Sequence, residues 1–271
     1  MGSTLPGTLV FMAMMAGLFI PLEAFFPART TKPSARARAM GAALLVVNTL
    51  LMQWLGVPVL RALGSVVDAP VTRSAGVMVV VFVAADLMGY FVHRAMHRVP
   101  MLWRFHRLHH DATELSWLDA WRQHPVDFVL HGIAVGLPGA LMGASLSELA
   151  SVVVLRKAFT TFLHANLAVN FGLVLASPAF HGVHHSAEPR DFDTNFAGTF
   201  PLWDVVFGTL HGPLARDTRA SGAAHANAAE FFFAQLSNEL GLRPVSSSKV
   251  LVTSAAPPDL ISASNSSRAS A

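Results

Sequence analysis

The sequence has 271 residues, of which 53% are hydrophobic and 13% charged, and its formal net charge is +3. A soluble domain contains about 25% charged residues, so this deficit predicts a chain whose main solvent is lipid. The absence of cysteine excludes disulfides, thiolate metal sites and iron–sulfur clusters, and leaves the 13 histidines as the main metal-binding resource. The small net charge, with basic residues in loops beside apolar segments, also argues against nucleic-acid binding.

Five apolar segments approach the roughly 20 residues that are needed to cross a bilayer. In chain order they are residues 5–26, 40–59, 76–92, 128–142 and 146–163. The first is long and has no Lys or Arg before it, which favours a retained membrane helix over a cleaved signal peptide. The last two are short and are separated by a turn at Gly143, so we expect a hairpin that does not fully cross. These segments predict an all-α integral membrane protein with four to five apolar helices.

The charged loop between the first two segments sets the expected orientation. It carries Arg29, Lys32, Arg36 and Arg38, and the positive-inside rule therefore places it in the cytoplasm. Counting the crossings from there brings the end of the third segment and both ends of the hairpin back to the cytoplasmic face. We therefore expect a histidine-rich helical cap on that face, because histidines follow at each of these places.

The chain divides into two parts by composition. Residues 1–213 are predicted to form one membrane domain, with its motif-bearing part at residues 86–209. Within it, residues 171–210 are too polar to span and rich in aromatics, and are expected to fold back as a cap with an interfacial helix. Residues 214–271 form an Ala/Ser-rich tail that is predicted to be largely disordered, apart from a short helix near residues 228–240.

Three histidine clusters carry the chemistry of the sequence. A spacing of four residues places two imidazoles about 40° apart on a helix, so that they face one metal or two adjacent metals. Neutral imidazole suits Fe, Zn, Cu and Ni, and ten histidines are too many for one metal but about right for two. The clustered histidines, with two isolated ones at the ends of the hairpin, are His93, His97, His106, His109, His110, His181, His184, His185, His124 and His164.

Other polar residues near the apolar segments have competing interpretations. Asp86 and Tyr90 share the helix face of His93, so Asp86 is expected to orient an imidazole or to hold Tyr90. His131, His211 and His225 are expected to be structural. Arg156 and Lys157 fall inside the fifth segment: they could contact a polar lipid head group, or pair with Asp86, but we expect snorkelling or a segment that never crosses.

Four blocks together resemble the fatty acid hydroxylase/sterol desaturase superfamily. They read DLMGYFVHRAMH, HRLHHDATELSWLDAWRQHPVD, FLHAN and SPAFHGVHHSAEPRDFDTNFAGTFPLWDVVFGT, and they cover residues 86–209. The resemblance implies that the ten histidines bind two irons (zinc could replace them in purified protein) and that O2 is a co-substrate. No catalytic residue is expected beyond the metal centre. Asp193 and Asn195 match the family's segment after the last cluster and are expected to hydrogen-bond to the ligands.

The resemblance also implies the reaction and its partners. Family members hydroxylate, desaturate or cleave lipids such as fatty acyl chains and sterols, so the expected reaction is O2-dependent oxidation of a lipid C–H bond. Electrons would come from a separate ferredoxin- or cytochrome b5-like donor with its reductase. The Ala-rich composition, rather than the resemblance, favours a bacterial inner membrane as the location. Two alternatives stay open: a membrane zinc hydrolase, and a non-catalytic membrane metal- or haem-binding protein.

Overall fold

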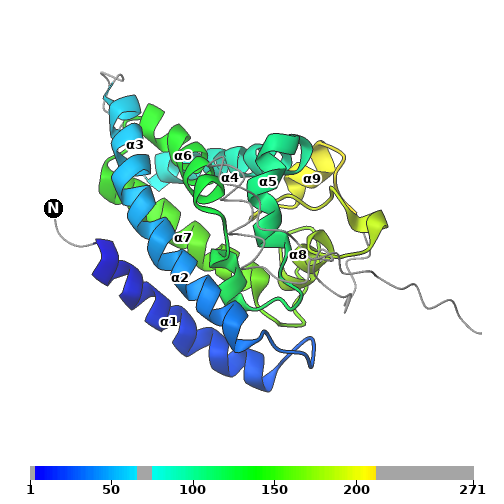
Figure 1. Ribbon diagram of the computed structural model, residues 1–271. Helices are drawn as coiled ribbons and strands as arrows, with labels where there is room; N and C mark the ends of the chain where they lie inside the picture. The colour runs from blue at the N-terminus through cyan, green and yellow to red at the C-terminus, as the bar shows by residue number, and fades with distance from the viewer. Residues whose placement is uncertain (1–3, 66–74, 212–271) are drawn as a thin grey trace, which may run out of the picture.

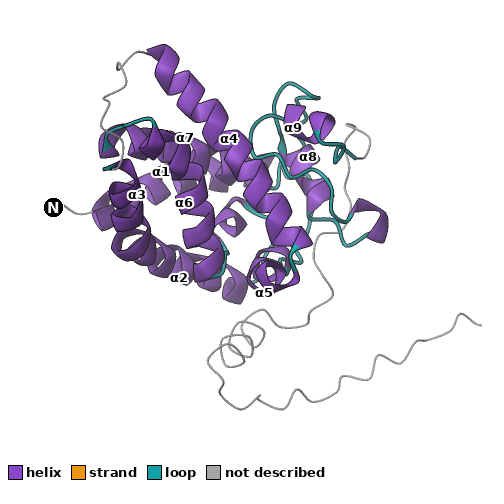
Figure 2. Ribbon diagram, turned by 90° about the horizontal axis from the view of Figure 1, so that it is seen from above, coloured by secondary structure: helices purple, strands orange, loops and turns teal. Residues whose placement is uncertain are grey.

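The computed structural model describes residues 4–65 and 75–211, and every regular element in these ranges is a helix (Figures 1 and 2). Its only extended pairing is an isolated bridge between Pro27 and Leu167. The all-α prediction is confirmed for this part of the chain. The tail from residue 212 onward, with its predicted helix and His225, lies outside the described residues.

The first two long helices lie side by side along one edge of the molecule (Figure 1). The first is α1 (Thr4–Phe25); the second runs without a break from Ala35 to Gly64 and combines α2 (Ala35–Leu51), a π-helical turn η1 (Met52–Gly56) and α3 (Val57–Gly64). The Ser34 hydroxyl starts this helix by accepting a hydrogen bond from the backbone N–H of Ala37. The helix is therefore longer at both ends than the predicted segment of residues 40–59.

The remaining helices form the rest of the bundle and the cap. The hairpin of α6 and α7 turns at Gly143, whose φ of 70° suits glycine, and the Ser145–Glu148 capping box then starts α7. The elements in chain order are α4 (Ala75–Arg98), α5 (Pro100–His110), η2 (Trp117–Trp121), α6 (Pro125–Leu141), α7 (Leu146–His164), α8 (Pro178–His184), η3 (Pro189–Asp191) and α9 (Leu202–Val206).

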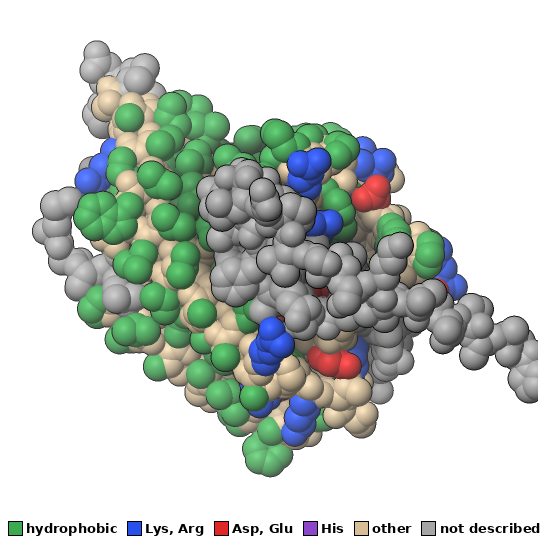
Figure 3. Space-filling model, viewed as in Figure 1, with side chains coloured by type: hydrophobic (Ala, Val, Ile, Leu, Met, Phe, Trp, Pro, Cys, Tyr) green, Lys and Arg blue, Asp and Glu red, His purple; other side chains and the backbone are tan. Residues whose placement is uncertain are grey.

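Within the described residues, three helices are long and apolar enough to cross a membrane: residues 6–25, 35–64 and 75–98; α6 is apolar but shorter. Large hydrophobic side chains point outward along them, for example Met14 (64% exposed), Trp54 (76%) and Val79 (62%). Figure 3 shows hydrophobic side chains spread over α1 to α3, with charged ones mainly near the cap and the loop after α1. The protein is an integral membrane protein, since only lipid would cover such a surface.

A buried ion pair joins the bundle to the cap. Arg156 on α7 lies 2.5 Å from a carboxylate oxygen of Asp86 on α4, and both side chains are buried. The other oxygen of Asp86 accepts hydrogen bonds from the backbone N–H of Phe200 (3.1 Å) and from the indole N–H of Trp203 (2.8 Å). The expectation that Arg156 snorkels is wrong, and Asp86 anchors the cap rather than contacting a histidine or Tyr90.

Candidate metal centre

Five histidines meet where the end of α4 lies against α5 and α8. One ring nitrogen from each lies within 4.8 Å of those of the other four, and four of the five residues are buried. Within this group the Nε2 atoms of His97 and His110 are 3.1 Å apart. The members of this five-histidine group are His93, His97, His106, His110 and His184.

Four further histidines form a second group beside the first. All four are buried, and one ring nitrogen from each again lies within 4.8 Å of the others. They come from the ends of α5 and α7, from α8 and from the residue that directly follows it. The members of this four-histidine group are His109, His164, His181 and His185. The structure thus brings nine of the ten predicted ligands together at one end of the bundle, as two adjacent groups.

The spacing within each cluster explains how the histidines divide between the groups. His106 and His110, four residues apart, belong to the five-histidine group, whereas the intervening His109 belongs to the four-histidine group. In α8 the assignment is reversed: His181 and His185 are in the four-histidine group and His184 in the other. Residues i and i+4 differ by about 40° around a helix, whereas i+3 lies about 60° to the other side, so one helix can serve both groups.

The hydrogen bonds of His109 and His164 leave their Nε2 atoms in a state suited to binding a cation. Each Nδ1 contacts a backbone carbonyl, Arg122 O at 3.3 Å for His109 and Thr160 O at 2.8 Å for His164. A carbonyl only accepts, so each Nδ1 carries the ring proton and each Nε2 presents a lone pair. The two Nε2 atoms are 3.0 Å apart. Two facing lone pairs repel each other, whereas a metal ion bound by both nitrogens would stabilise this arrangement.

A loop after α8 orients three rings of the five-histidine group. The Nδ1 of His184 donates to the carbonyl of Thr194 (2.7 Å), and the Nδ1 of His93 donates to the carbonyl of Phe196 (2.8 Å). The Nδ1 of His97 lies 3.5 Å from the Asp193 carboxylate. The Nε2 atoms of His93 and His184 are buried and have no hydrogen-bond partner among the described residues, which is the state that a metal ligand requires.

Asn195 and Asp204 give this loop its shape. Asp193 and Asn195 both adopt positive φ angles, 59° and 56°, which Asp and Asn tolerate better than most residues. The Asn195 amide donates to the carbonyls of Phe180 (3.3 Å) and His211 (3.0 Å), while Asp204 accepts from the backbone N–H of Phe196 (2.8 Å). Asn195 therefore holds the loop that orients the rings, and among the described residues its side chain hydrogen-bonds to backbone groups and to no histidine ring.

Asp127 is a functional residue that the sequence analysis missed. Its carboxylate lies 3.0 Å from the Nδ1 of His106 and is fully buried, at the start of α6. The ring of His106 is thereby fixed with Nδ1 protonated and Nε2 turned toward the group. The signal was present in the sequence as a carboxylate three residues after His124, but only the fold shows which histidine it reaches.

Replacing Asp127 by Asn should lower metal affinity about 10- to 100-fold, because loss of an acceptor behind a metal-bound imidazole weakens the ligand by about that factor. The measurement is metal retained by the purified variant during titration with a chelator. Asp119→Asn is a matched control, since Asp119 is also buried but accepts only from Ser116. Equal retention by the two variants would contradict a role of Asp127 in orienting His106.

Burial favours the neutral form of several clustered histidines in the cap, and the neutral form is the one that binds a metal. Burial holds the pKa of His109, His110 and His185 well below the ordinary histidine value, and the neighbouring histidines lower it further. Burial also lowers the pKa of His184 to about 3. Such a cluster of neutral imidazoles could hold metal ions without first losing protons.

The other predicted residues lie near the groups but in different roles. His124 belongs to neither group, and its Nδ1 accepts from the backbone N–H of Val126 at the start of α6 (3.1 Å). Its assignment as a ligand stays a prediction. Tyr90 is fully buried and its hydroxyl contacts Thr209 (2.8 Å). His131, expected to be structural, lies 6.5 Å from His93 between ring centres and lines the cavity described next.

An apolar cavity of about 500 Å³ leads to the two groups from the side of the bundle. Its inner end is lined by histidines of both groups, and its walls by apolar residues of α6 and α7. Its lining also includes Gly7 of α1, Gln53 of η1 and Val154 of α7; these residues are exposed, so the cavity opens at the surface of these helices. The cavity could therefore receive an apolar molecule from the bilayer.

Comparison with known proteins gives independent evidence on the class. A family model described as fatty acid hydroxylase matches residues 78–209, the part that carries both histidine groups. An ornithine lipid hydroxylase of Rhizobium tropici is 32% identical over 158 residues, covering 57% of this chain and 47% of that protein. A methylsterol monooxygenase of Aspergillus fumigatus is 29% identical over 148 residues, covering 52% and 49%.

The human alkylglycerol monooxygenase is 27% identical over 137 residues, covering 48% of this chain and 29% of that protein. The chain thus spans less than half the length of each of these relatives. No solved structure shows significant similarity to it. The fold and the site together define a class: an all-helical integral membrane protein with two histidine groups that could bind metal. Over residues 78–209 the chain matches the fatty acid hydroxylase family, and its relatives support the fatty acid hydroxylase/sterol desaturase superfamily.

Proposed function

We propose that this protein is a di-iron enzyme that uses O2 to oxidise a C–H bond of a membrane lipid. The observation that carries the proposal is the position of the two histidine groups at the inner end of an apolar cavity that begins at the lipid-facing surface. Relatives named as lipid hydroxylases and sterol monooxygenases support the same reaction class. Bound iron would supply the activation of O2 and the removal of hydrogen from a substrate carbon.

The protein's own residues position the ligands and the substrate. The nine grouped histidines would hold the two irons, with backbone carbonyls and the carboxylates of Asp127 and Asp193 fixing their rings. The apolar cavity walls would exclude water and hold a lipid chain beside the metals. Insertion of one oxygen atom gives an alcohol, whereas removal of a second hydrogen gives an alkene, and both outcomes fit this geometry.

The orientation and the electron supply are part of the proposal. The basic residues around the loop after α1 favour a cytoplasmic metal centre, and the membrane we propose is a bacterial inner membrane. Electrons would come from a separate ferredoxin- or cytochrome b5-like protein. Arg94, Arg98 and Arg104, on α4 and α5 beside the histidine groups, together with Arg107, could dock such an acidic donor.

The test combines metal analysis with an oxygen-isotope experiment on the full chain purified in detergent. We expect about two irons per chain and, with a ferredoxin and its reductase under ¹⁸O₂, a heavier hydroxylated product, or an alkene without the label, from a membrane lipid extract. The His109→Ala, His184→Ala double variant should lose both signals. Zinc-dependent, O2-independent lipid hydrolysis would instead establish the zinc hydrolase, and a Soret band with no turnover would establish a haem-binding protein.

A further inference from the structure

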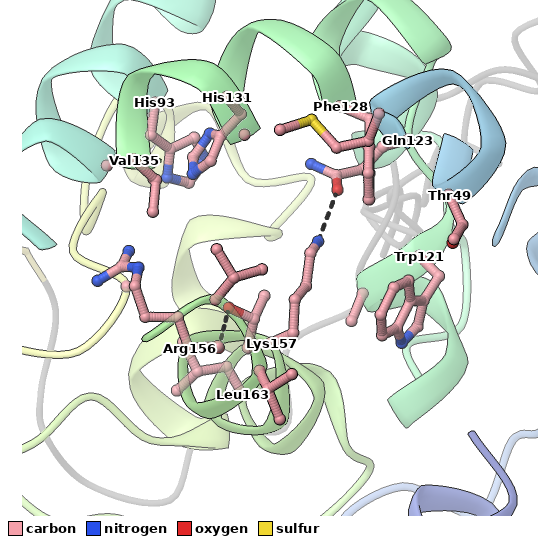
Figure 4. Close-up of a pocket in the computed structure, with 18 of the residues that line it drawn as sticks. Thr49, His93, Trp121, Gln123, Phe128, His131, Val135, Arg156, Lys157 and Leu163 are labelled. Atoms are coloured by element: carbon pink, nitrogen blue, oxygen red, sulfur yellow. Dashed lines mark hydrogen bonds between the residues drawn. The ribbon is translucent and has the colours of Figure 1, made fainter. Parts of the chain in front are cut away.

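Lys157 places a positive charge inside the apolar cavity. It lies on α7 and lines the cavity, and its side chain extends between the rings of Trp121 and Phe128 toward Gln123 (Figure 4). The Nζ atom donates to the Gln123 side-chain oxygen at 3.2 Å, and it lies 4.9 and 4.6 Å from the two ring centres. The ammonium group is therefore held in one position rather than extended to a distant aqueous surface.

No carboxylate of the described residues lies within ion-pair distance of Lys157, and the buried Asp127 attracts its charge only from farther away. The adjacent Arg156 points the other way and pairs with Asp86, so it is already neutralised (Figure 4). The carboxylate of Asp127 is bonded to His106. Of the three N–H donors of the ammonium, one is used by Gln123, and the aromatic rings compensate the charge only in part.

A cation in a low-dielectric cavity is unfavourable unless an anion binds there, and such residues usually mark a substrate path. An ammonium next to an amide group provides donors for the two oxygens of a monoanion, which matches a carboxylate. The position of Lys157 relative to the histidine groups also limits which part of the substrate could reach a bound metal. Lys157 and His164 are seven residues apart on the same face of α7, about 10 Å along the helix axis.

We propose that the substrate is a lipid with a carboxylate group, which binds Lys157 and the Gln123 amide and thereby fixes which carbon reaches the metals. This inference rests on the proposed function and adds the substrate class to it. The separation of the Lys157 ammonium from the histidine groups then sets which carbon of the lipid is oxidised. Lys157 is a specificity-determining residue, since it contacts the charged group and not the reacting carbon.

The test is a binding measurement that needs no turnover. The purified full chain is titrated with 9,10-dibromostearate and, separately, with the corresponding dibromo-alcohol, which has the same chain without the charge. Binding is followed by quenching of tryptophan fluorescence, with Trp121 in the cavity wall as the reporter. We expect the carboxylate to bind at least about tenfold more tightly than the alcohol, because a charge-assisted hydrogen bond is lost with the latter. Lys157→Met should abolish this preference, while Lys157→Arg should keep most of it.

Lys32→Met is the matched control, because Lys32 is exposed in the loop after α1 and lies outside the cavity; it should bind like the wild type. The metal content of each variant is measured in parallel, so that a failed metal centre is distinguished from a failed carboxylate site. Equal affinities of wild-type protein for acid and alcohol, or an unchanged preference in Lys157→Met, would overturn the proposal. Stronger competition by hexadecyl phosphate than by palmitate would replace the carboxylate with a phosphate.

Discussion

Replacing His185 with alanine is expected to remove about one of two metal ions from the purified protein, and replacing its neighbour His184 is expected to remove the other. The two residues are adjacent in the sequence but belong to different groups, since His185 lies with His109 and His184 with His93. Each substitution also leaves the facing imidazoles with one fewer nitrogen around a buried cation. We expect the rate of lipid oxidation to fall at least about 100-fold in either variant. This loss exceeds the one expected for removing a residue that only orients a ligand, because here the ligand itself is removed.

Metal analysis by mass spectrometry checks this result, with His124→Ala as the histidine control. His124 belongs to neither group, so the grouping predicts that this variant keeps both metals, whereas the family resemblance predicts that it loses a ligand. If His124→Ala lost a metal, His124 would be a tenth ligand and the nine-histidine assignment would be too small. If His184→Ala and His185→Ala both kept two metals, the division into two metal-binding groups would be rejected.

The second large effect is expected from Arg156→Met. This change leaves the Asp86 carboxylate buried without its cation, and removing one partner of a buried pair destabilises a protein by about 3–5 kcal/mol. Asp86 also accepts from the Phe200 backbone and the Trp203 indole, so the cap should loosen before the bundle does. Thermal unfolding of Arg156→Met, followed by tryptophan fluorescence, should begin at a clearly lower temperature than that of the wild type. Thiol-reactive dyes are unsuitable as a probe because the chain has no cysteine.

A double variant separates the pair from its surroundings. Asp86→Asn combined with Arg156→Met removes both charges, so it should be less destabilised than Arg156→Met alone. A double variant as unstable as the sum of the two single variants would show that Asp86 and Arg156 act independently. An Arg156→Met protein with wild-type stability would mean that the pair is not buried in the membrane-embedded protein.

Much of the centre could be predicted because histidine spacing and apolar length are local properties of the sequence. The apolar segments predicted helices, and the i, i+4 spacing predicted which faces of these helices carry ligands. The acceptors behind the rings could not be predicted in the same way. The carbonyls of Arg122, Thr160 and Phe196 belong to the backbone, which every residue has, so only the folded chain shows which ones reach a histidine.

Charged residues in apolar segments were harder to interpret. Both Arg156 and Lys157 are basic and both line the cavity. Arg156 is neutralised by Asp86, 70 positions earlier in the chain, whereas Lys157 donates to the uncharged Gln123 side chain. A one-residue step on a helix turns the side chain by about 100°, and the long-range partner decides what each charge does. The partner of Arg156 was named as an alternative, but the sequence alone gave no means of choosing it.

The lateral position of the cavity mouth has a kinetic consequence. Gly7, Gln53 and Val154 at the mouth are exposed on the surface that lipid covers, so a substrate would arrive by diffusion within the bilayer and its product would return there. The quantity that sets the rate is then the mole fraction of substrate in the membrane and not its total concentration in the suspension. Adding inert phospholipid at constant amounts of enzyme and substrate should slow the reaction through surface dilution.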